Sequence, residues 1–219
     1  MTRPRVGVLA MQGAFREHIA ALARLGADAV PLRSADELDR LDGVVLPGGE
    51  STTMDKLLRK FGLQQPLAER IRGGLPVMAT CAGVILLADE VRDGLRDQES
   101  LHLLPLKVRR NAYGRQPESF EADVELSVLD APFRGVFIRA PLIEEVGDGL
   151  DVIAEIEGAP VVVGDAHRLA LTFHPELSGD DRIHRYFLEE MVLPALGKTG
   201  LDGAEADAGH HAETREAAG

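Results

Sequence analysis

The sequence has little of what metal clusters, membranes and nucleic acids require. Its 219 residues include one cysteine and no tryptophan, which excludes an intramolecular disulfide framework and a zinc site built from several cysteines. No apolar run approaches the roughly 18 residues that span a bilayer. Lys and Arg number 24 against 36 Asp and Glu, and the net charge of −12 argues against nonspecific binding to nucleic acid or an anionic membrane.

The N-terminal segment does not read as a secretory signal. The apolar run Val6–Met11 is short, and polar Gln12 and charged Arg16 follow closely. A secretory signal has a longer apolar region that ends in a small-residue cleavage site. We therefore expect a cytoplasmic protein with no membrane partner, no nucleic-acid partner, no metal and no cofactor.

The amino-acid composition is that of a folded protein with one domain. Hydrophobic residues make up 45% of the chain, which is enough for a large core without disulfides or metal. The composition changes after Lys198: segment 198–219 holds six alanines, four glycines and five acidic residues, but only one large aliphatic residue, Leu201. We expect a single domain over residues 1–197 and a disordered acidic tail over 198–219.

Short apolar runs alternate with amphipathic stretches in the first half of the chain. This rhythm predicts an α/β fold of three layers, with helices on both faces of a mainly parallel sheet. The expected strands are Val6–Met11, Ala29–Leu32, Val44–Leu46 and Pro76–Thr80. The expected helices are Ala14–Leu25, a short one opened by Ser34, one capped by Ser51 or Thr52 and running to about Phe61, Leu67–Ile71 and Ala82–Ala88.

The second half of the chain is richer in strands. Some of these short strands are expected to form an antiparallel extension of the sheet, and a last helix is expected over Ile183–Leu193. The strands are Lys107–Arg109, Phe120–Leu126, Val136–Ile138, Val152–Ile156, Val161–Val163 and Leu169–Phe173.

Cys81 falls between an expected strand and an expected helix. Small residues at Ala79, Ala82 and Gly83 allow a tight turn there, which is the cysteine counterpart of a nucleophile elbow. The thiol would face the helix N-terminus, whose partial positive charge favours thiolate. A lone cysteine in an α/β protein is more often a buried core residue, so both interpretations stay open at this point.

A base for that thiol is available at the end of another strand. His174 follows the expected strand Leu169–Phe173, and catalytic groups of parallel sheets gather at the carboxyl ends of strands. Glu176, two residues further on, can orient the imidazole. Cys81, His174 and Glu176 thus supply a nucleophile, a base and its orienting acid. The pattern His-x-Glu alone is weak, because two polar residues in a surface loop look the same.

The run Pro47-Gly48-Gly49 also follows a strand. Its glycines can turn backbone N–H groups toward the site, and the N–H groups of Gly49 and Ala82 would form an oxyanion hole. The run is not a phosphate-binding loop, since neither of the known glycine-rich phosphate motifs is present.

The order of these motifs resembles that of class I, triad-type glutamine amidotransferases, and in particular the family of glutaminase subunits of pyridoxal 5′-phosphate synthases. The resemblance covers residues 5 to about 193. It is carried by Leu9-Ala-Met-Gln-Gly13, Arg16-Glu-His18, Pro47-Gly-Gly-Glu-Ser-Thr-Thr-Met54, Thr80-Cys-Ala-Gly83, Arg110-Asn-Ala-Tyr-Gly-Arg-Gln116, Ser119-Phe-Glu-Ala-Asp123, Val136-Phe-Ile-Arg-Ala-Pro141 and Thr172-Phe-His-Pro-Glu176.

The resemblance implies a glutaminase that hydrolyses L-glutamine to glutamate and ammonia. The ammonia would pass to a synthase subunit, a (β/α)8 barrel in a hetero-oligomeric complex, which builds pyridoxal 5′-phosphate from a pentose phosphate and a triose phosphate. By the same resemblance Cys81 is the nucleophile, with His174 and Glu176 completing the triad. The residues implied to contact glutamine are Gly48, Gly49, Glu50, Arg110, Ile138 and Arg139.

Other functions remain compatible with parts of this pattern. The same triad serves the glutaminases of histidine, purine and anthranilate synthesis, and γ-glutamyl hydrolysis. A scaffold or redox sensor of the same fold would use Cys81 as an oxidisable thiol, but it would not need His174 and Glu176. The segment Arg92–Pro105 keeps little of the family's usual pattern, so partner contacts there are open.

Overall fold

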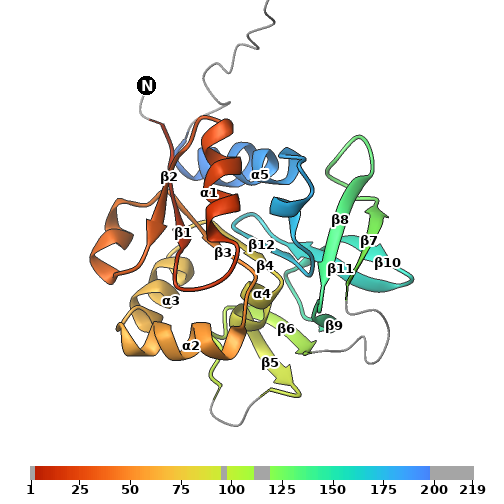
Figure 1. Cartoon of the computed structure of the whole chain (residues 1–219), viewed down its shortest axis with the longest axis horizontal. Helices are drawn as coiled ribbons and strands as arrows, with labels where there is room; N and C mark the ends of the chain where they lie inside the picture. Colours follow the sequence, from red (N-terminus) through yellow and green to blue (C-terminus); the bar gives the residue numbers. More distant parts are fainter. Residues whose placement is uncertain (1–2, 95–97, 111–118, 198–219) are drawn as a thin grey trace, which may run out of the picture.

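A seven-stranded sheet forms the centre of the molecule. The structure is a computed structural model that describes residues 3–94, 98–110 and 119–197 (Figure 1). The strand order is β10-β11-β12-β4-β3-β1-β2, and β12, β4, β3, β1 and β2 run parallel. The strands are β1 (Arg5–Leu9), β2 (Asp28–Leu32), β3 (Gly43–Leu46), β4 (Val77–Thr80), β10 (Asp151–Ile156), β11 (Ala159–Gly164) and β12 (Arg168–Leu171).

Helices cover both faces of this sheet. Figure 1 shows α1 and α5 on one side and α2, α3 and α4 on the other. The helices are α1 (Phe15–Arg24), α2 (Ser51–Lys60), α3 (Gln64–Arg72), α4 (Ala82–Leu87), α5 (Arg182–Tyr186) and α6 (Leu193–Ala195), with 3-10 turns η1 (Ala35–Arg40) and η2 (Pro175–Leu177) and a π-helical segment η3 (Phe187–Val192).

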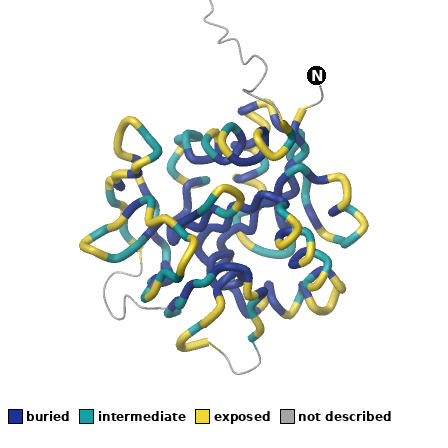
Figure 2. Tube along the Cα trace, turned by 180° about the vertical axis from the view of Figure 1, so that it is seen from behind, coloured by how far each residue is buried: buried dark blue, intermediate teal, exposed yellow. Residues whose placement is uncertain are grey.

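Alternating side chains of the central strands divide the core into two layers. In β3, Val44 and Leu46 pack with α2, α3 and α4, whereas Val45 packs with the layer of α1 and α5. This period of two is the geometry of a strand, and both faces are apolar because both are covered. The buried residues accordingly lie along the central strands, and the exposed ones lie in the peripheral loops (Figure 2). The expected three-layer α/β class with a mainly parallel sheet is confirmed.

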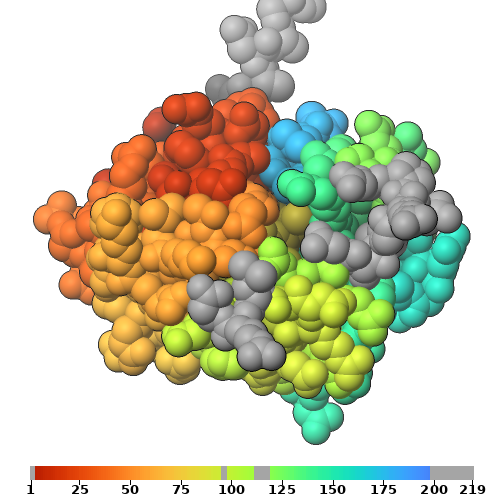
Figure 3. All heavy atoms as spheres, turned by 60° about the horizontal axis from the view of Figure 1, so that its bottom comes forward, coloured from red at the N-terminus to blue at the C-terminus, as the bar shows by residue number. Residues whose placement is uncertain are grey.

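The expected antiparallel extension is present, and two smaller sheets accompany it. Strands β10 and β11 join the parallel part through antiparallel pairing with each other and with β12. A second sheet consists of β5 (Ala88–Arg92), β6 (Leu104–Arg109) and β9 (Leu142–Val146), and a third of β7 (Ser119–Val124) and β8 (Phe133–Ile138). Figure 3 shows α2 and α3 beside β5 and β6 on one surface of the molecule.

Three local expectations need correction or refinement. Strands β5 and β9 were not expected, because charged residues interrupt their apolar runs. The cap of α2 is neither Ser51 nor Thr52: it is Glu50, whose carboxylate reaches the free N–H groups of Thr52 and Thr53 at 3.2 and 2.8 Å. The last expected helix, Ile183–Leu193, is divided by the π-helical segment η3. The proposed tail 198–219 lies outside the described residues.

Candidate active site

Cys81 occupies a strained turn between β4 and α4. Its φ of 49° and ψ of −107° are unusual for a residue with a side chain, and such strain of about 1–3 kcal/mol is typical of functional sites. The turn depends on Gly83, since a Cβ there would lie 2.2 Å from the backbone oxygen of Leu46. The backbone N–H of Cys81 is tied to the oxygen of Leu171 at 2.8 Å, which joins the turn to β12. The expected elbow is therefore present.

His174 and Glu176 lie beside this turn, just past the carboxyl end of β12. Nδ1 of His174 and Oε1 of Glu176 are 2.7 Å apart, and the side chain of Glu176 is fully buried. The backbone N–H of His174 donates to the oxygen of Val136 at 2.8 Å, so β8 helps to position the histidine. The structure thus brings together the three residues that the sequence predicted.

The protonation of His174 is set by these two neighbours. Burial opposes a charged imidazole, but hydrogen bonds and charge attraction from Cys81 and Glu176 outweigh it and raise the pKa of His174 to about 10. A protonated His174 beside Cys81 favours the thiolate form of the cysteine. The elbow therefore places the Cys81 side chain beside a histidine that is protonated at neutral pH.

A cavity of about 210 Å³ opens above Cys81 and His174. The expected oxyanion-hole residues Gly49 and Ala82 line it, as do the expected substrate contacts Glu50, Arg110, Ile138 and Arg139. Gly48 does not line the cavity but packs against the imidazole of His174. A Cβ at Gly48 would lie 2.2 Å from Cε1 of that ring. Glycine at position 48 therefore makes room for the histidine. The remaining lining residues are Gln12, Ser51 and Ile85.

The loop after β1 supports the Gly48–Glu50 segment. Oε1 of Gln12 accepts a hydrogen bond of 2.6 Å from the backbone N–H of Glu50. Gly13 packs so closely that an added Cβ would lie 1.8 Å from the oxygen of Gly48. This loop therefore controls the conformation of the two glycines that follow β3.

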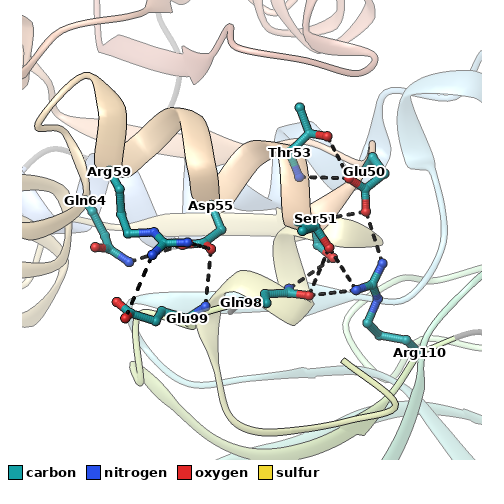
Figure 4. Close-up of polar contacts among 10 residues, drawn as sticks. Glu50, Ser51, Thr53, Asp55, Arg59, Gln64, Gln98, Glu99 and Arg110 are labelled. Carbon is teal, nitrogen blue, oxygen red and sulfur yellow. Dashed lines mark hydrogen bonds and ion pairs between the residues drawn. The ribbon is translucent and has the colours of Figure 1, made fainter. Parts of the chain in front are cut away.

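Arg110 and Glu50 form an ion pair at the rim of the cavity (Figure 4). Nη2 of Arg110 donates to Oε1 of Glu50 at 3.0 Å, and Nη1 donates to Oε1 of Gln98 at 2.7 Å. Partial burial raises the pKa of Glu50, but hydrogen bonds from Thr53 and Thr52 outweigh it and lower the pKa to about 2. A fixed negative charge and a fixed positive charge thus lie side by side at the mouth of the site.

The segment around Gln98 belongs to a longer polar network on the surface of α2. Nε2 of Gln98 donates to Oγ of Ser51 at 3.1 Å, and the next residue, Glu99, donates its backbone N–H to buried Asp55 at 3.2 Å. Asp55 also accepts from Arg59 at 2.7 Å. This network attaches the chain before β6 to the start of α2, and so holds Arg110 in place (Figure 4).

Sequence reasoning gave no role to Gln98 or to the buried histidines His18 and His184. Gln98 lies in a segment whose pattern departs from the resemblance, and its partners Ser51 and Arg110 are 47 and 12 residues away in the sequence. Histidines 18 and 184 are 166 residues apart, and only the tertiary structure brings their rings within 2.9 Å. The one sequence feature that could have pointed to either histidine is that His18 belongs to the motif Arg16-Glu-His18.

Metal ions and membranes are the next ligands to consider for residues 3–94, 98–110 and 119–197. Within these residues no group of three or more His, Cys, Asp or Glu is arranged to hold a metal ion. Nor is any described helix long and apolar enough to cross a membrane.

The fold is that of glutamine amidotransferases. A crystal structure described as a glutamine amidotransferase is 49% identical, with a TM-score of 0.80, and the match covers 84% of this chain and 97% of that one. A chain in the structure of PurLQS from Thermotoga maritima shares the fold, with a TM-score of 0.61 over 85% of this chain and 98% of its own, at 17% identity.

Sequence comparison defines the family more narrowly. The chain belongs to the SNO glutamine amidotransferase family, which it matches over residues 8–193. A relative from Nocardioides sp. is 50% identical over 86% of this chain and 96% of its own length, and one from Parafrankia sp. is 54% identical over 90% and 97%. Both are named pyridoxal 5′-phosphate synthase subunit PdxT.

Proposed function

We propose that this chain is the glutaminase subunit of a pyridoxal 5′-phosphate synthase. Its reaction is the hydrolysis of L-glutamine to L-glutamate and ammonia, with Cys81, His174 and Glu176 as the triad. The observation that carries this proposal is a cysteine on a strained elbow that lines the same cavity as a histidine whose Nδ1 lies 2.7 Å from a buried carboxylate. The names of the family and of its relatives support the same function.

The chemistry follows from the protonation of the triad. The Cys81 thiolate attacks the amide carbon of glutamine, and the oxyanion that forms accepts from backbone N–H groups at Gly49 and Ala82. His174 then donates its proton to the leaving nitrogen, so the C–N bond breaks, ammonia departs and a γ-glutamyl thioester remains. Neutral His174 next takes a proton from water, whose oxygen attacks the thioester and releases glutamate and the thiol. Glu176 stabilises the charged imidazole throughout.

The charged pair at the rim suits the zwitterionic end of an amino acid. Arg110 or Arg139 would bind the α-carboxylate, and Glu50 would bind the α-ammonium group. Glu50 is suited to this role because its low pKa keeps it ionised at neutral pH. The backbone of Ile138 closes the same side of the cavity, where its oxygen lies 3.8 Å from Sγ of Cys81.

The partner that we propose is a synthase subunit with a (β/α)8-barrel fold, in a hetero-oligomeric complex. Ammonia released into water at neutral pH becomes mostly ammonium, which is not a nucleophile, so direct transfer to a partner conserves the product. We place both subunits in the cytoplasm, where Cys81 stays reduced.

A reconstitution experiment tests the proposal. The chain is combined with the purified synthase subunit, a pentose phosphate and a triose phosphate, and pyridoxal 5′-phosphate is measured with glutamine or with ammonium chloride as the nitrogen source. We expect product from glutamine only when this chain is present, and product from ammonium chloride without it. Glutamine hydrolysis without stimulation of that synthase would instead favour a glutaminase of another pathway.

A further inference from the structure

A pair of buried histidines lies behind the triad, on the side away from the cavity. His18 belongs to α1 and His184 to α5, and both side chains are completely buried. Nε2 of His18 lies 3.2 Å from Oε2 of Glu176, the carboxylate oxygen that does not face His174. Nδ1 of His18 lies 2.9 Å from Nε2 of His184. Neither histidine lines the cavity, so neither can touch the substrate.

One arrangement of the ring hydrogens turns the positive edge of His18 toward Glu176. In this arrangement Nε2 of His18 carries a hydrogen, because a carboxylate oxygen accepts, and Nδ1 of His18 accepts from Nε2 of His184. Nδ1 of His184 is then unprotonated, in keeping with its lack of a hydrogen-bond partner among the described residues. The two neutral rings therefore point the positive ends of their dipoles toward Glu176.

Burial keeps these rings neutral. Desolvation, together with the charges of His184 and His174, holds the pKa of His18 well below its usual value, and desolvation lowers the pKa of His184 to about 4. The groups that face His18 are His174, Glu176 and His184, and Asp181 and Arg24 act in turn on His184. The pair is therefore a dipolar support for the carboxylate and not a second charge.

His18 also contacts the other half of the active site. Its Nε2 lies 3.3 Å from Oγ1 of Thr80, and that hydroxyl accepts the backbone N–H of Gly48 at 3.0 Å. In the same arrangement the hydrogen on Nε2 is donated to Oγ1 of Thr80, and the contact to Glu176 is a charge–dipole contact and not a hydrogen bond. One ring therefore connects the triad carboxylate to the loop that carries Gly48 and Gly49.

We propose that His18, supported by His184, is a positioning residue that holds the carboxylate of Glu176 in the orientation that His174 needs. Glu176 sits in the short turn η2, two residues from His174, and the polar contacts of its carboxylate among the described residues are those to His174 and His18. Without the contact from α1, the carboxylate can rotate away from Nδ1 of His174 and stabilises the imidazolium less well. The inference rests on the proposed function, because Glu176 acts on the reaction only through His174.

Two amide substitutions at the same position separate this role from a purely structural one. His18→Gln places an amide N–H near the position of Nε2, facing Glu176, whereas His18→Asn places it near Nδ1, facing His184. Both variants keep a polar side chain of similar size in the same pocket of α1, and melting temperatures check that they fold. Each is assayed in complex with the synthase subunit, with kcat and KM for glutamine measured separately.

We expect His18→Asn to lower kcat roughly 10-fold or more with KM little changed, because His18 orients the triad but does not bind substrate. His18→Gln should recover most of that loss. Equal losses in the two variants, or no loss in a folded His18→Asn, would overturn the proposal. Absence of turnover in the wild-type complex would instead count against the proposed function.

A second readout does not depend on turnover. Cys81 is the only cysteine, so the pH dependence of its alkylation by iodoacetamide in the full chain reports the thiol directly. The apparent pKa of the thiol should rise in His18→Asn, since a misplaced carboxylate weakens the imidazolium that stabilises the thiolate, and it should stay near the wild-type value in His18→Gln. Identical alkylation profiles in all three proteins would contradict the positioning role.

Discussion

Nδ1 of His174 lies 2.7 Å from Oε1 of Glu176, and the carboxylate that it contacts has no exposed surface. A carboxylate can be buried in this way only when charged or dipolar groups compensate the lost solvation. Here His174 supplies a positive charge on one side, and His18 supplies a ring dipole on the other. The packing of α1 and η2 against the sheet therefore fixes the orientation of His174.

Substitutions of His174 and Glu176 should lower glutamine turnover by unequal amounts. His174→Ala removes the group that transfers the proton, and we expect glutamine turnover to fall by roughly 10²- to 10⁴-fold. Glu176→Gln keeps an oxygen that can accept from Nδ1 but removes the charge, so its loss should be smaller. Initial rates of glutamate release in the synthase complex measure both. A Glu176→Gln variant as active as wild type would remove Glu176 from the mechanism.

The pKa of His174 predicts the alkaline limit of the reaction. Its folded-state pKa is raised above the ordinary value of 6.5 to about 10, so the imidazolium persists through neutral pH and is lost as pH rises through about 10. The stability that the charged ring contributes is likewise complete below pH 6.5 and lost toward pH 10. We expect kcat/KM to hold steady above neutrality and to decline near pH 10. A decline centred near pH 6.5 would contradict this protonation state.

Gln98 should influence substrate binding through Arg110. Gln98→Leu removes the 2.7 Å hydrogen bond to Nη1 of Arg110 and the contact to Ser51, so the guanidinium is held less firmly at the rim. We expect KM for glutamine to rise roughly 10-fold, or about 1.4 kcal/mol, with kcat little changed. Gln64→Leu is the matched control, because Gln64 belongs to the same network but contacts only its far end, at Asp55. Equal KM values in the two variants would refute the role of Gln98.

The isolated chain should be a poor glutaminase that its synthase partner activates. Gly48 and Gly49 can change peptide orientation at little steric cost, and the Gln12–Gly13 loop packs directly against them. Docking of a partner near this loop would therefore set the oxyanion hole. The measurement is glutamine turnover during a titration with the synthase subunit. Full activity in the free chain and a flat titration would exclude such control but would leave the glutaminase assignment intact.

The candidate site residues could be predicted from the sequence more readily than the helix cap and the strands around them. The proximity of Cys81 to His174 and Glu176 could be predicted because Cys81 directly follows β4 and the other two follow β12, and the carboxyl ends of parallel strands meet at one edge of a sheet. The cap of α2 was assigned to the wrong residue, since a glutamate rarely serves as a cap and its reach depends on the local backbone. Strands β5 and β9 pair with residues far along the chain, and no local pattern reports such pairing.

The contacts that position the site residues could not be predicted from the sequence, for a related reason. His18 and Glu176 come from opposite ends of the sequence, and their contact exists only because β1 and β12 belong to the same sheet and bring α1 beside η2. Likewise Gln98 reaches Arg110 only after the chain folds over α2. Neither contact can be predicted from the spacing of these residues along the sequence.

The most direct test of the account is covalent labelling of Cys81 by a glutamine analogue with an electrophilic carbon, such as 6-diazo-5-oxo-L-norleucine, in the synthase complex. A nucleophilic thiolate should take up one equivalent at Cys81, lose activity in parallel and be protected by glutamine, while Cys81→Ala and Cys81→Ser should fold, resist labelling and lose turnover by several orders of magnitude. Inactivation with the label on another residue, or glutamate release by Cys81→Ala at near the wild-type rate, would contradict the account.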